Sequence, residues 1–211
     1  MTGDRVTSSD GAGDAIDAVV EVGGPRWVLV KSDGGVEDEG AVKAGTPMLS
    51  GSFNPLHHGH EQLAESAGRL VGGEVVYELT VVNVDKPPLN AEEVRRRLRQ
   101  FVGVGRVVLT RAPRFVEKAR LFPGSSFVIG WDTAVRLMNA RYYGGSESEK
   151  VVALEEMQAV GVRFVVGGRS HDGAFQTLDD TEIPPEFSSM FEGIPESVFR
   201  ADVSSSELRG E

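Results

Sequence analysis

Cysteine is absent from the 211 residues of this sequence. Its absence excludes disulfide bonds, zinc sites built on thiolates and cysteine nucleophiles. Histidine is scarce as well, with four residues in the whole chain. Any chemistry that depends on histidine must therefore lie where these few residues gather.

A surplus of positive charge is also lacking. The chain has 22 Lys and Arg against 32 Asp and Glu, which gives a formal net charge of -10. A partner lined with phosphates would be repelled at long range, so broad binding of nucleic acid or of an anionic membrane is not expected. A local basic pocket for one small anion is compatible with this charge.

Long apolar runs are missing too. No window approaches the roughly 18 to 20 apolar residues that cross a bilayer. Residues 1–18 have neither the apolar core of a signal peptide nor the arginine-rich, acid-poor character of a transit peptide. We therefore expect a cytoplasmic protein, and a nuclear location is not excluded.

Two parts are expected along the chain, an N-terminal extension over 1–45 and a domain over 46–211. Residues 1–24 are rich in Gly, Asp and Ser and predict a poorly ordered tail. The stretch "RWVLVKSDGGV" at 26–36 predicts a strand, a turn and a peripheral hairpin. From residue 46 onward, short apolar runs alternate with helical periods, which is typical of a parallel α/β sheet.

The alternation after residue 46 predicts a doubly wound, Rossmann-like sheet of about five parallel strands with helices on both faces. Strands are expected at 47–51, 75–83, 106–110, 126–130 and 162–168. Helices are expected at 58–70, 90–101, 113–122, 132–143 and 147–160. The first strand-to-helix turn of such a sheet is where a phosphate-bearing ligand binds.

The sequence "GSFNPLHHGHEQL" at 51–63 occupies that turn and holds three of the four histidines. Gly51 and Ser52 let the backbone approach a nucleotide, and Gly59 leaves room for a phosphate at the first helical turn. His57 and His60 project from the same turn and predict hydrogen-bond donors for an anion. The alternatives are histidines that only cap a helix and a zinc site, for which a third ligand is lacking nearby.

A second polar cluster stands near the C-terminus, in "ADVSSSELRGE" at 201–211. Its hydroxyls and its guanidinium predict a cradle for the β- and γ-phosphates of a nucleotide; they belong to Ser204, Ser205, Ser206 and Arg209. The alternative is a solvated serine linker.

Both motifs resemble those of the nucleotidylyltransferase superfamily, which has a cytidylyltransferase-like fold. "GSFNPLHHGH" resembles its HxGH signature, with His57 and His60 as the paired histidines, and "VSSSELR" is similar to its ISSTxIR motif. The resemblance implies catalytic roles for His57, His60 and Arg209. It implies nucleotide binding by Gly51, Ser52, Phe53, Gly59, Asp132, Ser204, Ser205 and Ser206.

Further segments resemble nicotinamide-mononucleotide adenylyltransferases within this superfamily. In "FVIGWDTAVRL", Asp132 matches the aspartate that contacts the ribose, although it is equally compatible with a helix N-cap. Trp131 departs from the small residue usual there; it either stacks on a ligand or packs, and packing is favoured. The segment "NVDKPPL" makes Lys86 a candidate for binding the acceptor phosphate, and Arg111 is another acceptor-side candidate.

Several further cations have weaker assignments. Arg114 and Lys118 join Arg111 as acceptor-side candidates because they follow the same strand end. The run Arg95, Arg96, Arg97 and Arg99 predicts a solvated helix face.

The resemblance implies transfer of the AMP moiety of Mg-ATP to a phosphate-bearing acceptor, with nicotinamide mononucleotide as the expected acceptor and NAD and pyrophosphate as products. Mg²⁺ is expected to be held by phosphates and water, so no protein metal ligands are predicted. Alternatives are CTP in place of ATP, phosphopantetheine as acceptor, hydrolysis, and a nucleotide-binding protein without transferase activity. The oligomeric state is left open.

Overall fold

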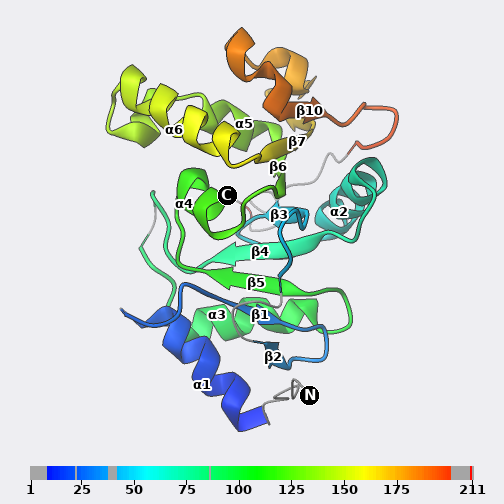
Figure 1. Cartoon of the computed structure of the whole chain (residues 1–211). Helices are drawn as coiled ribbons and strands as arrows, with labels where there is room; N and C mark the ends of the chain where they lie inside the picture. The colour runs from blue at the N-terminus through cyan, green and yellow to red at the C-terminus, as the bar shows by residue number, and fades with distance from the viewer. Residues whose placement is uncertain (1–8, 22, 38–41, 86, 201–209, 211) are drawn as a thin grey trace.

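The structure is a computed structural model that describes residues 9–21, 23–37, 42–85, 87–200 and 210. In this part of the chain a central sheet lies between two layers of helices (Figure 1).

The central sheet has eight strands in the order β10-β7-β6-β3-β4-β5-β1-β2. Six of them are parallel: β3 (Met48–Ser50), β4 (Val76–Thr80), β5 (Val107–Thr110), β6 (Ser126–Gly130), β7 (Arg163–Gly167) and β10 (Phe191–Gly193). The outer pair, β1 (Trp27–Val30) and β2 (Val36–Glu37), is antiparallel. This arrangement confirms the predicted doubly wound α/β fold.

Three strands join the five that the sequence predicts. The expected hairpin forms as β1 and β2, but β1 pairs with β5, with Trp27 opposite Thr110, and so extends the main sheet. At the other edge β10 pairs with β7 over three residues, "FEG". Its sequence has no alternating apolar pattern, and backbone pairing to β7 is what makes it a strand.

The helices form two layers, one on each face of the sheet. One apolar core includes side chains of α1 (Ser9–Val20), α2 (His58–Val71) and α3 (Ala91–Leu98). The other includes side chains of α4 (Phe115–Leu121), α5 (Trp131–Leu137) and α6 (Glu147–Ala159). Along β4, Tyr77 and Leu79 join the first core and Val76 joins the second, because successive strand residues point to opposite faces.

The expectation of a poorly ordered tail over 1–24 is wrong for α1. Ala12, Ile16 and Val19 recur at helical spacing and are buried in the first core. Arg95 of α3 forms an ion pair with Asp17, with 2.5 Å between Nη2 and Oδ1. The segment is rich in Gly, Asp and Ser, so its narrow apolar face is easily overlooked in the sequence. This face is buried because α1 packs against α3 and β1 in the folded protein.

Shorter elements complete the fold. The 3-10 helices are Arg99–Phe101, Ala140–Tyr143, Leu178–Asp180 and Pro185–Met190, and a hairpin of β8 (Arg169–His171) and β9 (Ala174–Gln176) follows β7. His171 is exposed in this hairpin. Among the described residues, no helix combines the length and the apolarity that a membrane crossing requires.

Candidate functional site

A cavity of about 530 Å³ opens at the carboxyl ends of the parallel strands. Strand β3 lies between β4 and β6, so the chain winds away from it in both directions. Open α/β sheets bind their ligands at this kind of switch point. Six of the residues predicted to be catalytic or to bind the nucleotide line the cavity: Gly51, Ser52, His57, Gly59, His60 and Asp132.

The loop between β3 and α2 is anchored by Phe53. Its backbone has a φ of 45°, and its ring is fully buried against Tyr77 and Phe101. A Cβ at Gly51 would lie 2.8 Å from this ring, so the position requires glycine. The side chain of Phe53 thus belongs to the core and is not part of the cavity wall, so a contact of this residue with a nucleotide would have to come from its backbone.

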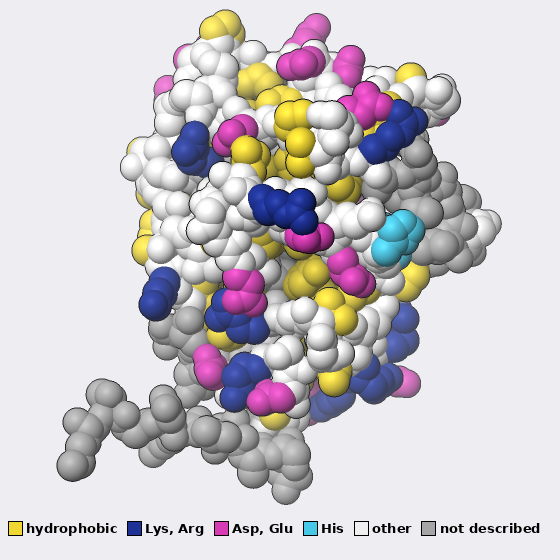
Figure 2. Space-filling view, turned by 90° about the vertical axis from the view of Figure 1, so that its right-hand side faces the viewer, with side chains coloured by type: hydrophobic (Ala, Val, Ile, Leu, Met, Phe, Trp, Pro, Cys, Tyr) yellow, Lys and Arg dark blue, Asp and Glu magenta, His cyan; other side chains and the backbone are white. Residues whose placement is uncertain are grey.

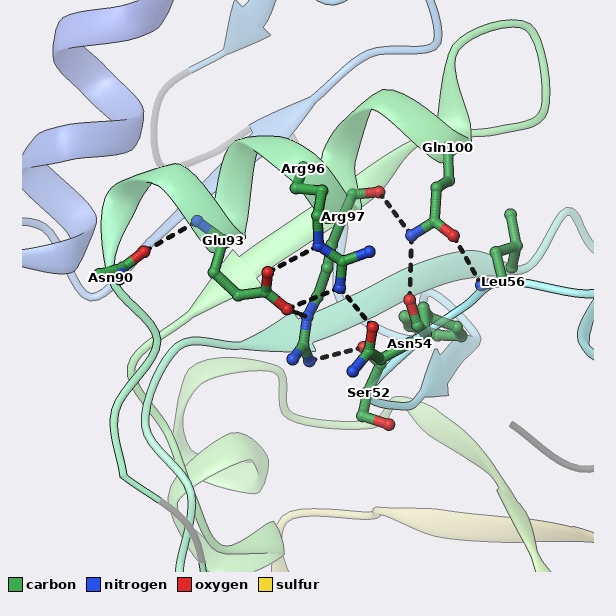
Figure 3. A network of polar contacts seen from close by, with 9 residues as sticks. Ser52, Asn54, Leu56, Asn90, Glu93, Arg96, Arg97 and Gln100 are labelled. Atoms are coloured by element: carbon green, nitrogen blue, oxygen red, sulfur yellow. Dashed lines mark hydrogen bonds and ion pairs between the residues drawn. The ribbon is translucent and has the colours of Figure 1, made fainter. Parts of the chain in front are cut away.

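Helix α3 and the 3-10 helix Arg99–Phe101 that follows it hold the same loop from outside (Figure 3). Arg97 Nη1 donates to the carbonyl of Ser52 at 2.8 Å. Gln100 Nε2 donates to the carbonyl of Phe53 at 3.0 Å, and its Oε1 accepts from the backbone N–H of Leu56 at 2.9 Å. Three backbone groups of the loop are therefore fixed by two side chains of one helical segment.

The arginine run on α3 is not simply a solvated face. Arg97 is 8% exposed and lines the cavity, so the prediction is wrong for this residue. Glu93 accepts from Arg97 Nε at 2.8 Å and from Arg96 Nε at 2.6 Å. The hydrogen bond from Arg96, followed by that from Arg97, lowers the pKa of Glu93 to about 2. Glu93 is therefore a carboxylate at neutral pH and aligns both guanidinium groups (Figure 3).

The two predicted catalytic histidines lie at the start of α2. His57 is the N-cap residue and His60 is the third residue of the helix. Their rings stack, with centroids 3.8 Å apart and planes at 29°. The edge of Phe53 packs against His60 at a centroid distance of 5.1 Å and supports the pair from the core.

Both imidazoles are held in the neutral form. Burial, then the neighbouring His57 and Arg169, lowers the pKa of His60 to about 3. Burial, then His58 and Arg169, lowers the pKa of His57 as well. His60 Nδ1 accepts from the backbone N–H of His57 at 3.3 Å, so the proton of the neutral ring must be on Nε2. His60 is therefore a neutral donor at the cavity wall.

Asp132 lies in the first turn of α5, where the β6 strand ends. It does not cap the helix: Gly130 occupies the N-cap position, and no side chain makes the cap hydrogen bond. Instead, Asp132 Oδ1 lies 3.2 Å from Arg169 Nη1, and both residues line the cavity. The sequence did not predict a role for Arg169, because the surrounding "GGRS" has no helical or strand pattern and looks like an ordinary loop.

Two acceptor-side candidates lie away from the cavity wall. Trp131 packs against the core on the α4 to α6 side, which agrees with the favoured alternative, and its ring faces His171 at 5.2 Å. Arg111 Nη1 donates to the carbonyls of Val19 and Val20, at 2.8 and 2.7 Å, and so caps the C-terminus of α1. Neither residue is part of the described cavity wall, so this geometry does not support their assignment to the acceptor.

The part of the cavity beside β4 and β5 has its own set of polar and aromatic groups. Arg114 and Lys118 line it as predicted candidates. The cavity wall as a whole also contains residues that the sequence did not single out: Thr80, Asn83, Asp85, Arg136, Tyr142 and Tyr143. These residues come from four separate segments. Only the fold brings them together, so no local sequence pattern predicts that they share a site.

Other predicted site residues lie outside the described part of the chain. They are Lys86, Ser204, Ser205, Ser206 and Arg209.

The donor set of the cavity suits phosphate oxygens better than a metal ion. Among the described residues, no group of three or more His, Cys, Asp or Glu could hold a metal. Of the cavity carboxylates, Asp132 pairs with Arg169, and Asp85 lies 3.6 Å from Arg141. A Mg²⁺ ion that arrives with its nucleotide fits this site because it keeps phosphate and water ligands.

The cavity concentrates positive charge in an acidic protein. Its described lining includes five Lys and Arg residues and two acidic ones, namely Arg97, Arg114, Lys118, Arg136 and Arg169 with Asp85 and Asp132. By contrast, Lys and Arg are intermixed with Asp and Glu on the outer face shown in Figure 2. The excess of cations in the described lining favours binding of an anion in the cavity.

The match to a protein-family model agrees with this geometry. The model of the cytidylyltransferase-like family matches residues 48–211, which include β3, the histidine pair and all described residues of the cavity wall. A comparison with curated protein sequences finds no match. Because the family match covers well over half of the sequence, the chain belongs to the cytidylyltransferase-like family of the nucleotidylyltransferase superfamily, which supports a general nucleotidyltransfer activity.

Proposed function

We propose that this protein transfers the AMP moiety of Mg-ATP to nicotinamide mononucleotide and releases NAD and pyrophosphate. The observation that carries the proposal is the stacked pair of neutral histidines at the start of α2, inside a cavity lined by permanent cations. Helix N–H groups and imidazole donors suit a phosphate, and the sequence resemblance supplies the choice of substrates.

In the proposed reaction, a phosphate oxygen of the acceptor attacks the α-phosphorus of ATP. A new P–O bond forms as the bond between the α-phosphorus and its bridging oxygen breaks, and pyrophosphate leaves with that electron pair. The acceptor phosphate is already anionic near neutral pH, so no general base is needed. Catalysis then depends on positioning and on charge stabilisation.

The residues have separate roles in this mechanism. His60 Nε2–H would donate to an oxygen of the α-phosphate, and His57 would act beside it. Arg169 would supply positive charge at the same end while orienting Asp132 toward the ribose. Ser204, Ser205, Ser206 and Arg209 would hold the departing pyrophosphate. Mg²⁺ would neutralise charge on the triphosphate.

The test is pyrophosphate release by the purified protein with Mg²⁺, ATP and nicotinamide mononucleotide, with the product identified by mass. NAD is the expected product, and replacing ATP with CTP should abolish formation of any dinucleotide. Release of pyrophosphate without acceptor would contradict transfer and indicate hydrolysis. Binding of ATP with no dinucleotide formed would exclude nicotinamide mononucleotide as the acceptor.

A further inference from the structure

Four polar side chains gather on one face of the sheet at the carboxyl ends of three neighbouring strands. They are Ser50 of β3, Glu78 of β4, Thr110 of β5 and Lys118 of α4. Ser50 and Glu78 are paired in register. Ser50 and Lys118 line the cavity, whereas Glu78 and Thr110 lie behind them with no exposed surface. The histidine pair lies on the other helical layer, so this polar cluster is distinct from it.

The centre of the cluster is a buried ion pair. Lys118 Nζ lies 2.5 Å from Glu78 Oε2, with side-chain exposures of 6% and 0%. Thr110 Oγ1 donates to Glu78 Oε1 at 2.6 Å. Burying two charges is costly, and an apolar pair of the same size would stabilise the fold as well. Stability alone therefore does not account for an ammonium at the cavity wall.

The geometry leaves the ammonium with donors to spare. Glu78 accepts one of the three N–H bonds of Lys118. Nζ lies 4.9 Å from the centroid of the Phe115 ring, which also lines the cavity. Since Glu78 and Thr110 hold the group in one place, its remaining donors are preorganised for a ligand.

An unpartnered hydroxyl supports the same conclusion. Ser50 Oγ is buried at the cavity wall and has no hydrogen-bond partner among the described residues. Buried polar atoms are rarely left unsatisfied in folded proteins, so an orphan at a cavity suggests a group that a ligand satisfies. Ser50 directly precedes Gly51 and therefore lies between the histidine loop and the Lys118 side of the cavity.

We propose that Lys118, held by Glu78 and Thr110, and the Ser50 hydroxyl bind oxygens of the acceptor phosphate and so select a phosphomonoester as the acceptor. The inference rests on the proposed function, because it assumes that the cavity holds a nucleotide and an acceptor together. It assigns the acceptor phosphate to the part of the cavity beside β4 and β5, where Arg114 at the start of α4 adds positive charge.

The test measures binding of ribose 5-phosphate by calorimetry, with Mg²⁺ and a non-transferable ATP analogue present. Lys118→Met alone leaves Glu78 as an unpaired buried charge and endangers the fold. The double variant Lys118→Met/Glu78→Gln removes the cation without this defect, and its new amide oxygen still accepts from Thr110. We expect it to bind ribose 5-phosphate at least about tenfold more weakly and the ATP analogue unchanged.

Ser50→Ala removes the Ser50 hydroxyl and leaves the ion pair between Lys118 and Glu78 unchanged. Since Ser50 Oγ has no protein partner, its removal should leave the melting temperature unchanged and weaken ribose 5-phosphate binding by roughly threefold. Lys150→Met is the matched control, because Lys150 is also a buried lysine in an ion pair, with Glu147, but lies outside the cavity wall. It should not change binding of either probe.

The outcomes separate this inference from the proposed function. Unchanged ribose 5-phosphate binding in the double variant, or an equal loss in the Lys150 control, would overturn it. A wild-type protein that binds the ATP analogue but never ribose 5-phosphate would also overturn it. If wild type fails to make NAD yet binds ribose 5-phosphate through Lys118, the inference holds and nicotinamide mononucleotide is replaced by another phosphomonoester.

Discussion

The imidazole of His60 lies against that of His57 with 3.8 Å between ring centroids, and its Nδ1 accepts the backbone N–H of His57. Two cations stacked this closely would repel each other, and Arg169 adds to the repulsion. The pair therefore works as neutral hydrogen-bond donors. Permanent positive charge at this end of the described cavity comes from Arg169.

Replacement of His60 by alanine should slow turnover by about 100-fold or more, because it removes a donor aimed at the reacting phosphate. The measurement is kcat for pyrophosphate release, with circular dichroism to check the fold. His58→Ala is the matched control, since His58 is the exposed neighbour that does not line the cavity. A His60 variant with wild-type kcat would remove this residue from the chemistry.

The histidine pair should also make stability depend on pH. An unfolded chain protonates His60 near pH 6.5, whereas the folded chain does so only near pH 3. Between these values the unfolded state binds more protons, so the free energy of unfolding falls as pH is lowered. The contribution of His60 is at most about 1.4 kcal/mol per pH unit. The free energy of unfolding, measured with urea, should therefore fall less between pH 7 and pH 5 in His60→Gln than in wild type. Equal losses would mean that His60 titrates normally in the folded protein.

Much of the sheet follows from the sequence because its central strands are predominantly apolar runs. Strands β4 to β7 have both faces buried, so "VVYELT" or "SFVIG" carries its own signal. The histidine turn is likewise predictable, since Gly51, His57 and His60 are close in sequence and share one loop and helix start.

What the sequence could not predict depends on contacts between distant segments. The cation Arg97 lies in a run of four arginines, and only its bond to the Ser52 carbonyl distinguishes it from its exposed neighbour Arg96. Arg111 and Lys118 follow the same strand, yet one caps α1 and the other reaches the cavity. The sign of the charge is the same in each case, so tertiary position decides the role.

Gly51→Ala should disturb the loop from within. The added Cβ would lie 2.8 Å from the buried ring of Phe53, so the loop or the ring must move. We expect a loss of roughly 1–3 kcal/mol in the free energy of unfolding, and a lower kcat because the ring also supports His60. Gly73→Ala is the control, since a Cβ there meets nothing closer than 3.9 Å. Unchanged stability in Gly51→Ala would show that the loop adapts freely.

Arg97→Met should loosen the same loop from outside. It removes the bond to the Ser52 carbonyl and one of the two partners of Glu93. Charged hydrogen bonds of this kind contribute about 1.5–3 kcal/mol, and we expect a loss of that order together with a raised KM for ATP. Arg69→Met is the control, because Arg69 is an exposed arginine paired with Glu65 on α2. If both variants behave alike, the hydrogen bond from Arg97 to the Ser52 carbonyl has no role in the site.

Arg169→Met should shift the titration of the histidines upward. Arg169 contributes to the lowered pKa of both His57 and His60, so removing its charge should raise both values while burial keeps them below 6.5. The same change frees Asp132 from its ion pair and should raise the KM for ATP. NMR titration of the imidazole protons measures the first effect and steady-state kinetics the second. Arg163→Met serves as the control, because Arg163 is exposed at the opposite end of β7. Histidine pKa values that do not move in Arg169→Met would show that Arg169 does not set the charge of the pair, and a permanent cation for the α-phosphate would then have to be sought elsewhere in the cavity.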